Sequence, residues 1–451
     1  MNNRKENKMG TLPIPKLLVS MSVPIMVSML IQALYNVVDS IFVAKLSEDA
    51  LTAVSLAFPV QVMMIAVAVG TAIGMNALLS RRLGEKNYAE ANLVATNGIF
   101  LSVVSALGFA LFGIFGIKAF FSAFVEPGAV MEMGMNYTSI ISIVSFGIFL
   151  SITGERLLQA TGITIYSMYS QMAGAITNII LDPILIFGLL GAPKMGVSGA
   201  AVATVIGQIV SCILVFMFNI MKNHEINLSM KNFRPDRHII AEIYKVGLPS
   251  IFMQTIGAIM TFGMNKILIM FSQTAVSVFG IYFKLQSFVF MPLFGLTSGM
   301  IPIVGFNYGA RHRERIVHTV RLSCLMALGI AAVGLAIFQI FPRQILSTLF
   351  DASDTMLAIG MPALRIISLH FLLAAISIIL SSAFQALGKG MYSLIMSAIR
   401  QLVVLLPAAY FLGRFISLNA LWFAFPIAEV VAVILALVLY RRLYEKEIKP
   451  M

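Results

Sequence analysis

Twelve apolar runs of more than 20 residues, each closed by a short polar stretch, restrict the fold of this chain more than any other feature. A bilayer core about 30 Å thick is spanned by about 20 apolar helical residues. Backbone groups in lipid must be paired within the protein, so only helices or closed barrels cross it, and these runs are too long for barrel strands. The sequence predicts an all-α polytopic membrane protein with helices near residues 17–44, 51–79, 91–117, 133–158, 164–190, 197–220, 241–271, 276–303, 317–341, 356–384, 391–413 and 417–440.

Basic residues are unevenly distributed between the segments that connect these runs. If the N-terminus lies inside, 22 of the 31 Lys and Arg residues fall on the inner side, five on the outer side and four within spans. This asymmetry follows the positive-inside rule and predicts that both termini are cytoplasmic. Contact with anionic lipid of the inner leaflet then explains the net charge of +12, so we expect no nucleic-acid partner.

The two halves of the sequence are related by an internal repeat. Six spans in each half give both halves the same orientation, so an axis along the membrane normal should relate them, with a cavity between them. A shift of 225 residues pairs Pro24 with Pro249, Gln61 with Gln286, Gly70 with Gly295, Gly74 with Gly299 and Gly84 with Gly309, and a shift of 226 pairs Gln159 with Gln385 and Gly162 with Gly388. We interpret the matched Gln and Gly positions mainly as residues that pack helices and shape turns.

The repeat predicts two pseudo-symmetric six-helix bundles. They are an N-lobe over residues 17–220 and a C-lobe over residues 241–440. A polar, basic loop over residues 221–240 should connect the lobes on the cytoplasmic side. The remaining segments, 1–16 and 441–451, are predicted to be cytoplasmic tails.

Asp39 is the first of three acidic residues that we place well inside spans, together with Asp182 and Glu429. An ionisable group at that depth is costly and usually marks an ion or substrate pathway. Gln32, Asn36 and Asp39 are spaced i, i+4 and i+7 and share one helix face, with Tyr35 one turn before Asp39. We favour a functional role for this face, and the alternative is a polar cluster that holds helices together.

Asn178 and Asp182 form a second pair at i, i+4 spacing, and Pro183 follows directly. Because Pro lacks an N–H, it frees the carbonyl of Ile179, so three oxygen-bearing groups can converge. Oxygen ligands of this kind suit a hard cation, whereas a desolvated carboxylate can carry a proton. The alternative without function is a Pro kink with a local cap.

Glu429 is less informative, because the same half carries four basic residues inside spans with which it can pair. These are Lys266, Lys284, Arg365 and Arg400. Signatures of soluble enzymes are absent from the sequence: it contains no His-Glu-x-x-His, no Walker A loop and no Gly-x-Ser-x-Gly. We therefore expect a transporter that is not an enzyme.

Several motifs together resemble the multidrug and toxic compound extrusion (MATE) family, in its bacterial branch, over nearly the whole chain. In the first half they are Val38-Asp39-Ser40-Ile41-Phe42-Val43, the Asn178 to Pro183 pair and Gly199-Ala200-Ala201-Val202-Ala203-Thr204. In the second half they are Lys284-Leu285-Gln286-Ser287-Phe288 with Pro302, and Asn307-Tyr308-Gly309-Ala310.

The resemblance implies a cation-driven antiporter of the plasma membrane in which Na+ or H+ enters while an amphipathic compound leaves by alternating access. It implies a cation site at Asp39, Asn178, Asp182 and Thr204, where Na+ can bind, and Thr204 enters this set from the resemblance alone. The helix that carries an acidic residue in other branches reads Gly257-Ala258-Ile259-Met260-Thr261-Phe262 here, which argues against a second cation site in the C-lobe. We expect no cofactor, a monomer, and a substrate cavity lined by Gln32, Tyr35, Asn36, Lys284, Gln286 and Arg400.

Two alternatives stay open at this point. The basic residues of the C-lobe also suit an exporter or flippase of a lipid-linked or anionic substrate. An intramembrane enzyme needs a nucleophile and a base paired at membrane depth, and we find no convincing pair. The sequence does not choose between Na+ and H+ and does not name the substrate.

Overall fold

The computed structural model describes residues 7–229, 231 and 233–451. Over these residues it is helical without any strand, which confirms the all-α prediction. Within the described residues, ten helices are long and apolar enough to cross a membrane, and counting each of two bent helix pairs as one span gives twelve. Arg4 and Lys5 of the predicted N-terminal tail, and Met230 and Asn232 of the predicted linker, lie outside the described residues.

The first six spans form one bundle, which corresponds to the predicted N-lobe. Its fourth span is broken, and its two parts meet at an angle of 45°. The elements are α1 (Lys8–Thr11), α2 (Ile14–Ala44), α3 (Glu48–Gly84), α4 (Tyr88–Phe115), α5 (Ile117–Ser122), α6 (Ala129–Ile143) with α7 (Phe146–Ala160), α8 (Thr164–Phe187), the short η1 (Leu189–Gly191) and α9 (Val197–Lys222).

The last six spans form the second bundle and repeat this plan. The fourth span is again broken, with an angle of 47° between its parts. The elements are α10 (Arg237–Leu268), α11 (Gln273–Gly309), α12 (Arg313–Ile340), α13 (Pro342–Phe350), α14 (Asp354–Ser368) with α15 (Phe371–Ala386), α16 (Gly390–Ala398) with the π-helical η2 (Ile399–Leu405) and α17 (Leu406–Phe415), and α18 (Leu418–Leu421) with α19 (Ala424–Leu443) and η3 (Tyr444–Ile448).

The repeat is visible in local structure as well as in span order. The two 37-residue helices α3 and α11 both begin with a Ser cap: the hydroxyls of Ser47 and Ser272 accept hydrogen bonds from the backbone three residues on, each at 3.0 Å. Gly162 and Gly388 both have positive φ, +91° and +77°. The interpretation of these matched glycines as turn residues is therefore confirmed.

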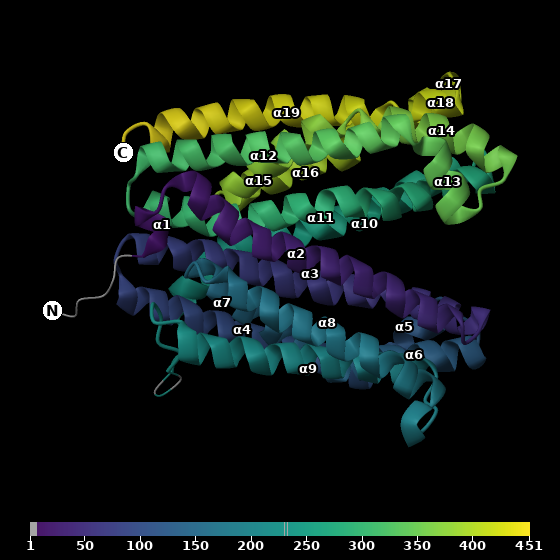
Figure 1. Cartoon of the computed structure of the whole chain (residues 1–451), viewed down its shortest axis with the longest axis horizontal. Helices are drawn as coiled ribbons and strands as arrows, with labels where there is room; N and C mark the ends of the chain where they lie inside the picture. Colours follow the sequence, from purple (N-terminus) through teal and green to yellow (C-terminus); the bar gives the residue numbers. More distant parts are fainter. Residues whose placement is uncertain (1–6, 230, 232) are drawn as a thin grey trace.

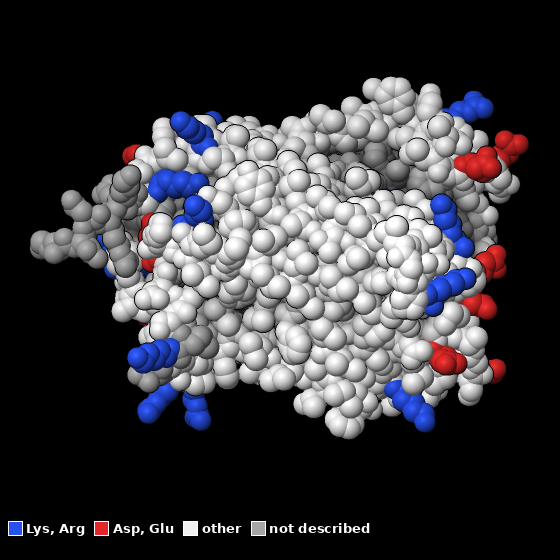
Figure 2. Space-filling model, turned by 60° about the horizontal axis from the view of Figure 1, so that its bottom comes forward, with Lys and Arg blue, Asp and Glu red and all other residues white. Residues whose placement is uncertain are grey.

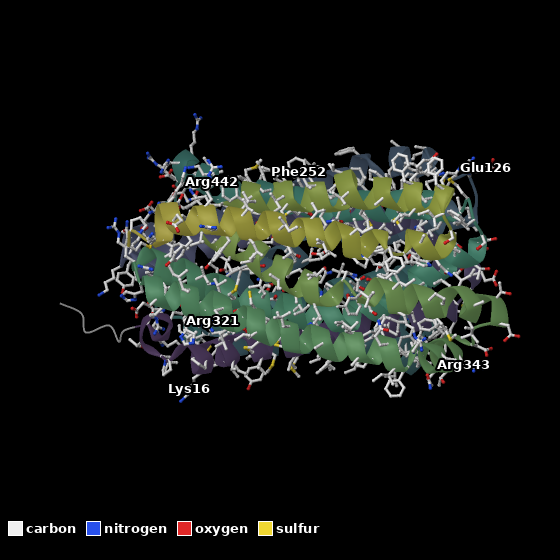
Figure 3. The ribbon with its side chains drawn as sticks, turned by 90° about the horizontal axis from the view of Figure 1, so that it is seen from above. Lys16, Glu126, Phe252, Arg321, Arg343 and Arg442 are labelled. Carbon is white, nitrogen blue, oxygen red and sulfur yellow. The ribbon has the colours of Figure 1, made fainter. Side chains whose placement is uncertain are left out.

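The two bundles lie side by side along their length, and α1 and the C-terminus lie at the same end of the molecule, which we name the terminal end (Figure 1). Charged side chains gather at the two ends of the face in Figure 2, and the belt between them is uncharged. Lys16, Arg321 and Arg442 lie toward the terminal end, and Glu126 and Arg343 lie at the opposite end (Figure 3). The residues predicted to be on the inner side thus lie toward one end and Arg343, predicted to be on the outer side, lies at the other. The limits of the lobes, loop and tails remain a prediction.

Glycines matched by the repeat make the contact between the bundles. A Cβ atom on Gly74 of α3 would lie 2.1 Å from the carbonyl oxygen of Ile243 in α10. A Cβ atom on Gly299 of α11 would lie 2.9 Å from the Cα atom of Ser22 in α2. Each central helix therefore needs glycine to approach a helix of the other bundle this closely.

The bundles are packed together at the terminal end and diverge at the opposite end. In α11, Gly295–Asn307 is buried throughout, and Gly295 contacts Met26 of α2. Phe288 and Lys284 lie seven and eleven residues before Gly295, so they share its helix face, yet both are exposed. One face of α11 is thus covered by the other bundle near the terminal end and uncovered farther along.

Candidate functional site

Three of the four residues predicted to bind a cation form one buried hydrogen-bonded group where α8 packs against α9. Asp182, Asn178 and Thr204 are 0%, 3% and 8% exposed. In the orientation that satisfies both polar atoms of its amide, Asn178 donates to Asp182 at 3.1 Å and accepts from the Thr204 backbone N–H at 3.1 Å. The i, i+4 spacing on α8 and the small residues of α9 explain this proximity.

Asp39 completes the group from α2, which packs against α8. Its carboxyl group lies within hydrogen-bonding reach of the Asp182 carboxyl group. One oxygen of Asp39, Oδ1, is buried without a hydrogen-bond partner in the described structure. A buried carboxylate oxygen without a donor is costly, so this oxygen is open to a further partner.

Two tyrosines and a glutamine surround the two carboxyl groups. Tyr35 and Tyr137 lie within electrostatic range of both Asp39 and Asp182. The side chain of Gln61 donates to the Tyr137 hydroxyl at 2.8 Å. The face of α2 that is predicted to be functional therefore contributes Asp39 to the acidic pair and places Tyr35 next to it.

The other residues predicted to line the substrate cavity are more exposed than the acidic pair or lie away from it. Gln32 and Asn36 of α2 are exposed, as is Lys284 of α11, while Gln286 is half-buried. Arg400, in the π-helical segment η2, donates to both oxygens of Glu429 at 3.3 and 3.4 Å. The structure therefore brings Arg400 to Glu429 of its own bundle, which confirms that Glu429 pairs with a basic residue of the C-lobe.

Sequence reasoning missed two site residues and one further buried carboxylate. Gln61 carried a signal, because the repeat matches it to Gln286. Tyr137 carried none, because the repeat does not match it to another polar residue. Glu155 lies near the end of a predicted span next to Arg156, a position that does not indicate burial, but the residue is buried in α7.

The donor set fits a hard cation. Two carboxyl groups, one amide and one hydroxyl offer only oxygen ligands to it, and the Asp39 oxygen is free to bind. No group of three or more His, Cys, Asp and Glu side chains in the described parts of the chain could hold a metal ion. A cation here would therefore depend on the amide and hydroxyl as well as on the carboxyl pair.

A comparison with family models matches the chain twice to the MatE family, over residues 24–184 and 249–411. Each match falls in one bundle. Among curated relatives, the multidrug export protein MepA of Staphylococcus haemolyticus is 26% identical over 423 residues, 94% of this chain and 92% of the relative. MepA of Staphylococcus aureus strain MRSA252 is 25% identical over 431 residues, 95% of this chain and 93% of the relative.

Solved structures are similar over the full length of both chains. An outward-facing multidrug resistance MATE family transporter of the MOP superfamily superposes with a TM-score of 0.93 at 26% identity. A MOP superfamily transporter from Pyrococcus furiosus, described as having a binding pocket of reverse polarity that suggests a different function, superposes with a TM-score of 0.92 at 27% identity.

Proposed function

We infer that this chain, which belongs to the MatE family and is a multidrug efflux transporter of the membrane, works as an antiporter driven by Na+ or H+. The observation that carries this proposal is the meeting of Asp39 with Asp182, Asn178 and Thr204, where one carboxylate oxygen has no partner. A cation bound there neutralises a buried charge that the protein otherwise leaves uncompensated.

Coupling follows if the cation and the substrate favour different conformations or compete for the same groups. Tyr35 lies beside Asp39, and Asn36 and Gln32 lie one and two turns from Asp39 on the same helix, so a change at the carboxyl pair can reach the residues predicted to line the substrate cavity directly. A site contributes coupling free energy only through such a difference in affinity.

We propose that the terminal end is cytoplasmic, because most basic residues of the connecting segments lie on that side. The bundles are packed at that end and diverge at the other, so this structure is then outward-facing. Export begins from the opposite state, in which the terminal end has opened to admit substrate.

The substrate class we favour is an amphipathic organic compound, as for the multidrug export relatives. Lys284 supports a second candidate, an anionic or lipid-linked substrate. It is an exposed cation on the α11 face that continues from Gly295 into the space between the bundles. The Pyrococcus furiosus relative, whose binding pocket is described as having reverse polarity, supports this second candidate.

Flux in proteoliposomes tests the proposal. Gradients of Na+ and of pH are imposed separately, and export of a cationic dye is followed for the wild type and for Asp39→Asn. This substitution removes the charge and nearly conserves the volume, so gradient-driven export should be lost while the protein inserts normally. Export at the wild-type rate by Asp39→Asn would reduce Asp39 to a residue that packs helices.

A further inference from the structure

Glu155 of α7 is a second buried acid in the N-lobe that the proposed cation site does not use. Its side chain is 6% exposed. It accepts hydrogen bonds from Gln171 of α8 at 3.0 Å and from Ser151 at 3.4 Å. Arg156 is the one charged side chain near it in the described structure, and Gln171 and Ser151 are neutral.

Glu155 lies on a continuous polar face inside the N-lobe. On α8, polar or small residues recur every three or four positions toward the terminal end, at Asp182, Asn178, Gly174, Gln171 and Ser167. On α9 the same spacing holds for Thr204, Gln208 and Ser211, and on α7 for Ser151, Glu155 and Gln159. These three faces meet one another.

Hydrogen bonds connect the face step by step on the terminal side of the cation site. Ser151 of α7 and Ser211 of α9 share a hydrogen bond of 3.0 Å. Gln159 of α7 donates to Ser167 of α8 at 3.2 Å. Arg156 in turn donates to Gln159 at 2.9 Å. The polar groups thus continue from Glu155 to the turn between α7 and α8.

Glu155 lies about midway along this face. Gln171, which donates to it, is seven residues from Asn178 and seven from Thr164, the first residue of α8. At 1.5 Å per residue, each interval is about 10 Å. The carboxyl group therefore stands between the cation site and the terminal end of the bundle.

One close contact between α8 and α9 lies between Glu155 and the cation site. Gly174 of α8 and Gly207 of α9 touch: a Cβ atom on Gly174 would lie 2.8 Å from the Gly207 carbonyl oxygen, and one on Gly207 would lie 2.7 Å from the Gly174 carbonyl oxygen. Asn178 lies one turn after Gly174 on α8, and its Cβ atom is 3.2 Å from the Cβ position of Gly207. A small separation of α8 from α9 at these glycines would join the two polar regions.

Hydrogen bonding alone does not require an acid at position 155. A neutral Gln or Ser could accept from Gln171 and Ser151, whereas a buried carboxylate carries a desolvation cost that is usually tied to function within a membrane. Resting on the function proposed above, we propose that Glu155 is an intermediate binding station for the coupling cation between the Asp39–Asp182 site and the terminal end. The cation then leaves through the interior of the N-lobe, apart from the substrate path between the bundles.

If the cation is a proton, the Asp182 carboxyl group gives it up and becomes a carboxylate, and the Glu155 carboxylate accepts it and later releases it to bulk water. If it is Na+, the ion moves from one carboxylate to the other without covalent change. In both cases one positive charge passes through, and both acids are carboxylates once it has left.

Glu155→Gln tests this station because it keeps the shape and the acceptor oxygen and removes the charge. Three quantities are measured: cation affinity of the purified protein, dye export driven by a cation gradient, and dye-for-dye exchange without a gradient. We expect affinity and exchange within about twofold of the wild type and gradient-driven export slower by about tenfold or more. Glu155→Asp, which restores the carboxylate, should recover part of the gradient-driven rate.

Thr153→Val is the matched control. Thr153 lies two residues away on α7 and pairs with Ser102 of α4, off the polar face. This variant should keep the wild-type ratio of gradient-driven export to exchange.

Normal gradient-driven export by Glu155→Gln would overturn the station. So would an equal loss of export and exchange, which marks a structural role. If Glu155→Gln does not fold, Glu155→Ser, which also lacks the charge, decides: a lower export rate at unchanged exchange supports the station, and unchanged or equally reduced rates overturn it. The proposed function fails separately, if Asp39→Asn exports normally.

Discussion

Replacing Gly74 with Ala should open the terminal end, because the added methyl group has no room there. Its Cβ atom would lie 2.1 Å from the carbonyl oxygen of Ile243 and 2.9 Å from the backbone nitrogen of Gly247, and ordinary contact begins at 3.4 Å. Both neighbours are backbone atoms, which cannot rotate away. Helices α3 and α10 must therefore separate by about 1 Å at this point or adopt the alternative conformation.

The magnitude follows from the cost of overpacking, about 1–3 kcal/mol for an added methylene in a packed site. Because the contact exists only when the terminal end is closed, this cost falls on one conformation. It shifts the ratio of closed to open molecules by about 5-fold to 150-fold. The helix propensity gained on replacing Gly with Ala acts in both conformations and cancels.

A distance measurement between two spin labels reads this ratio. Ala89 and Glu314 are exposed near the terminal ends of α4 and α12, one in each bundle, and they are replaced by Cys. Cys212 and Cys324 are both free and are first replaced by Ser. We expect a longer distance component to grow in Gly74→Ala.

Gly108→Ala is the control, since no atom lies within 4 Å of its Cβ position in α4. It should leave the distances unchanged. An unchanged distribution in Gly74→Ala would refute the reasoning, because it would mean that the α3–α10 contact does not hold the terminal end closed.

Three further predictions concern other parts of the molecule. We expect Asn178→Ala and Thr204→Ala each to weaken Na+ binding by about tenfold in a calorimetric titration. Lower pH should weaken Na+ binding too, since protons compete for the same carboxyl groups. If neither variant changes the Na+ affinity, a protonation switch is favoured instead. A Cys at position 446 should resist an impermeant thiol reagent added outside intact cells, and reaction there would reverse the topology. Arg315→Ala should speed amide exchange in residues 8–12 by about tenfold or more, because Arg315 donates to the carbonyls of Met9 and Leu12 at 2.9 and 2.8 Å; Arg313→Ala, whose side chain contacts Tyr444 instead, should not.

Local and periodic features of this protein were predictable from the sequence. Span length and the repeat predicted twelve spans in two bundles, and the described residues form them. The pairing of Asn178 with Asp182 was equally accessible, because residues four apart on a helix always share a face. The same rule placed Tyr35 beside Asp39.

Contacts between helices were decided by the tertiary structure alone. Nothing in the local sequence indicates that Tyr137 meets Asp39, that Arg400 rather than Lys266 or Lys284 pairs with Glu429, or that Glu155 points into the N-lobe. An apolar helix in a membrane has several faces that lipid or protein can cover equally well, since hydrophobicity does not distinguish them. Which face turns inward is fixed by close packing, as at Gly74 and Gly299, and only the folded chain contains that information.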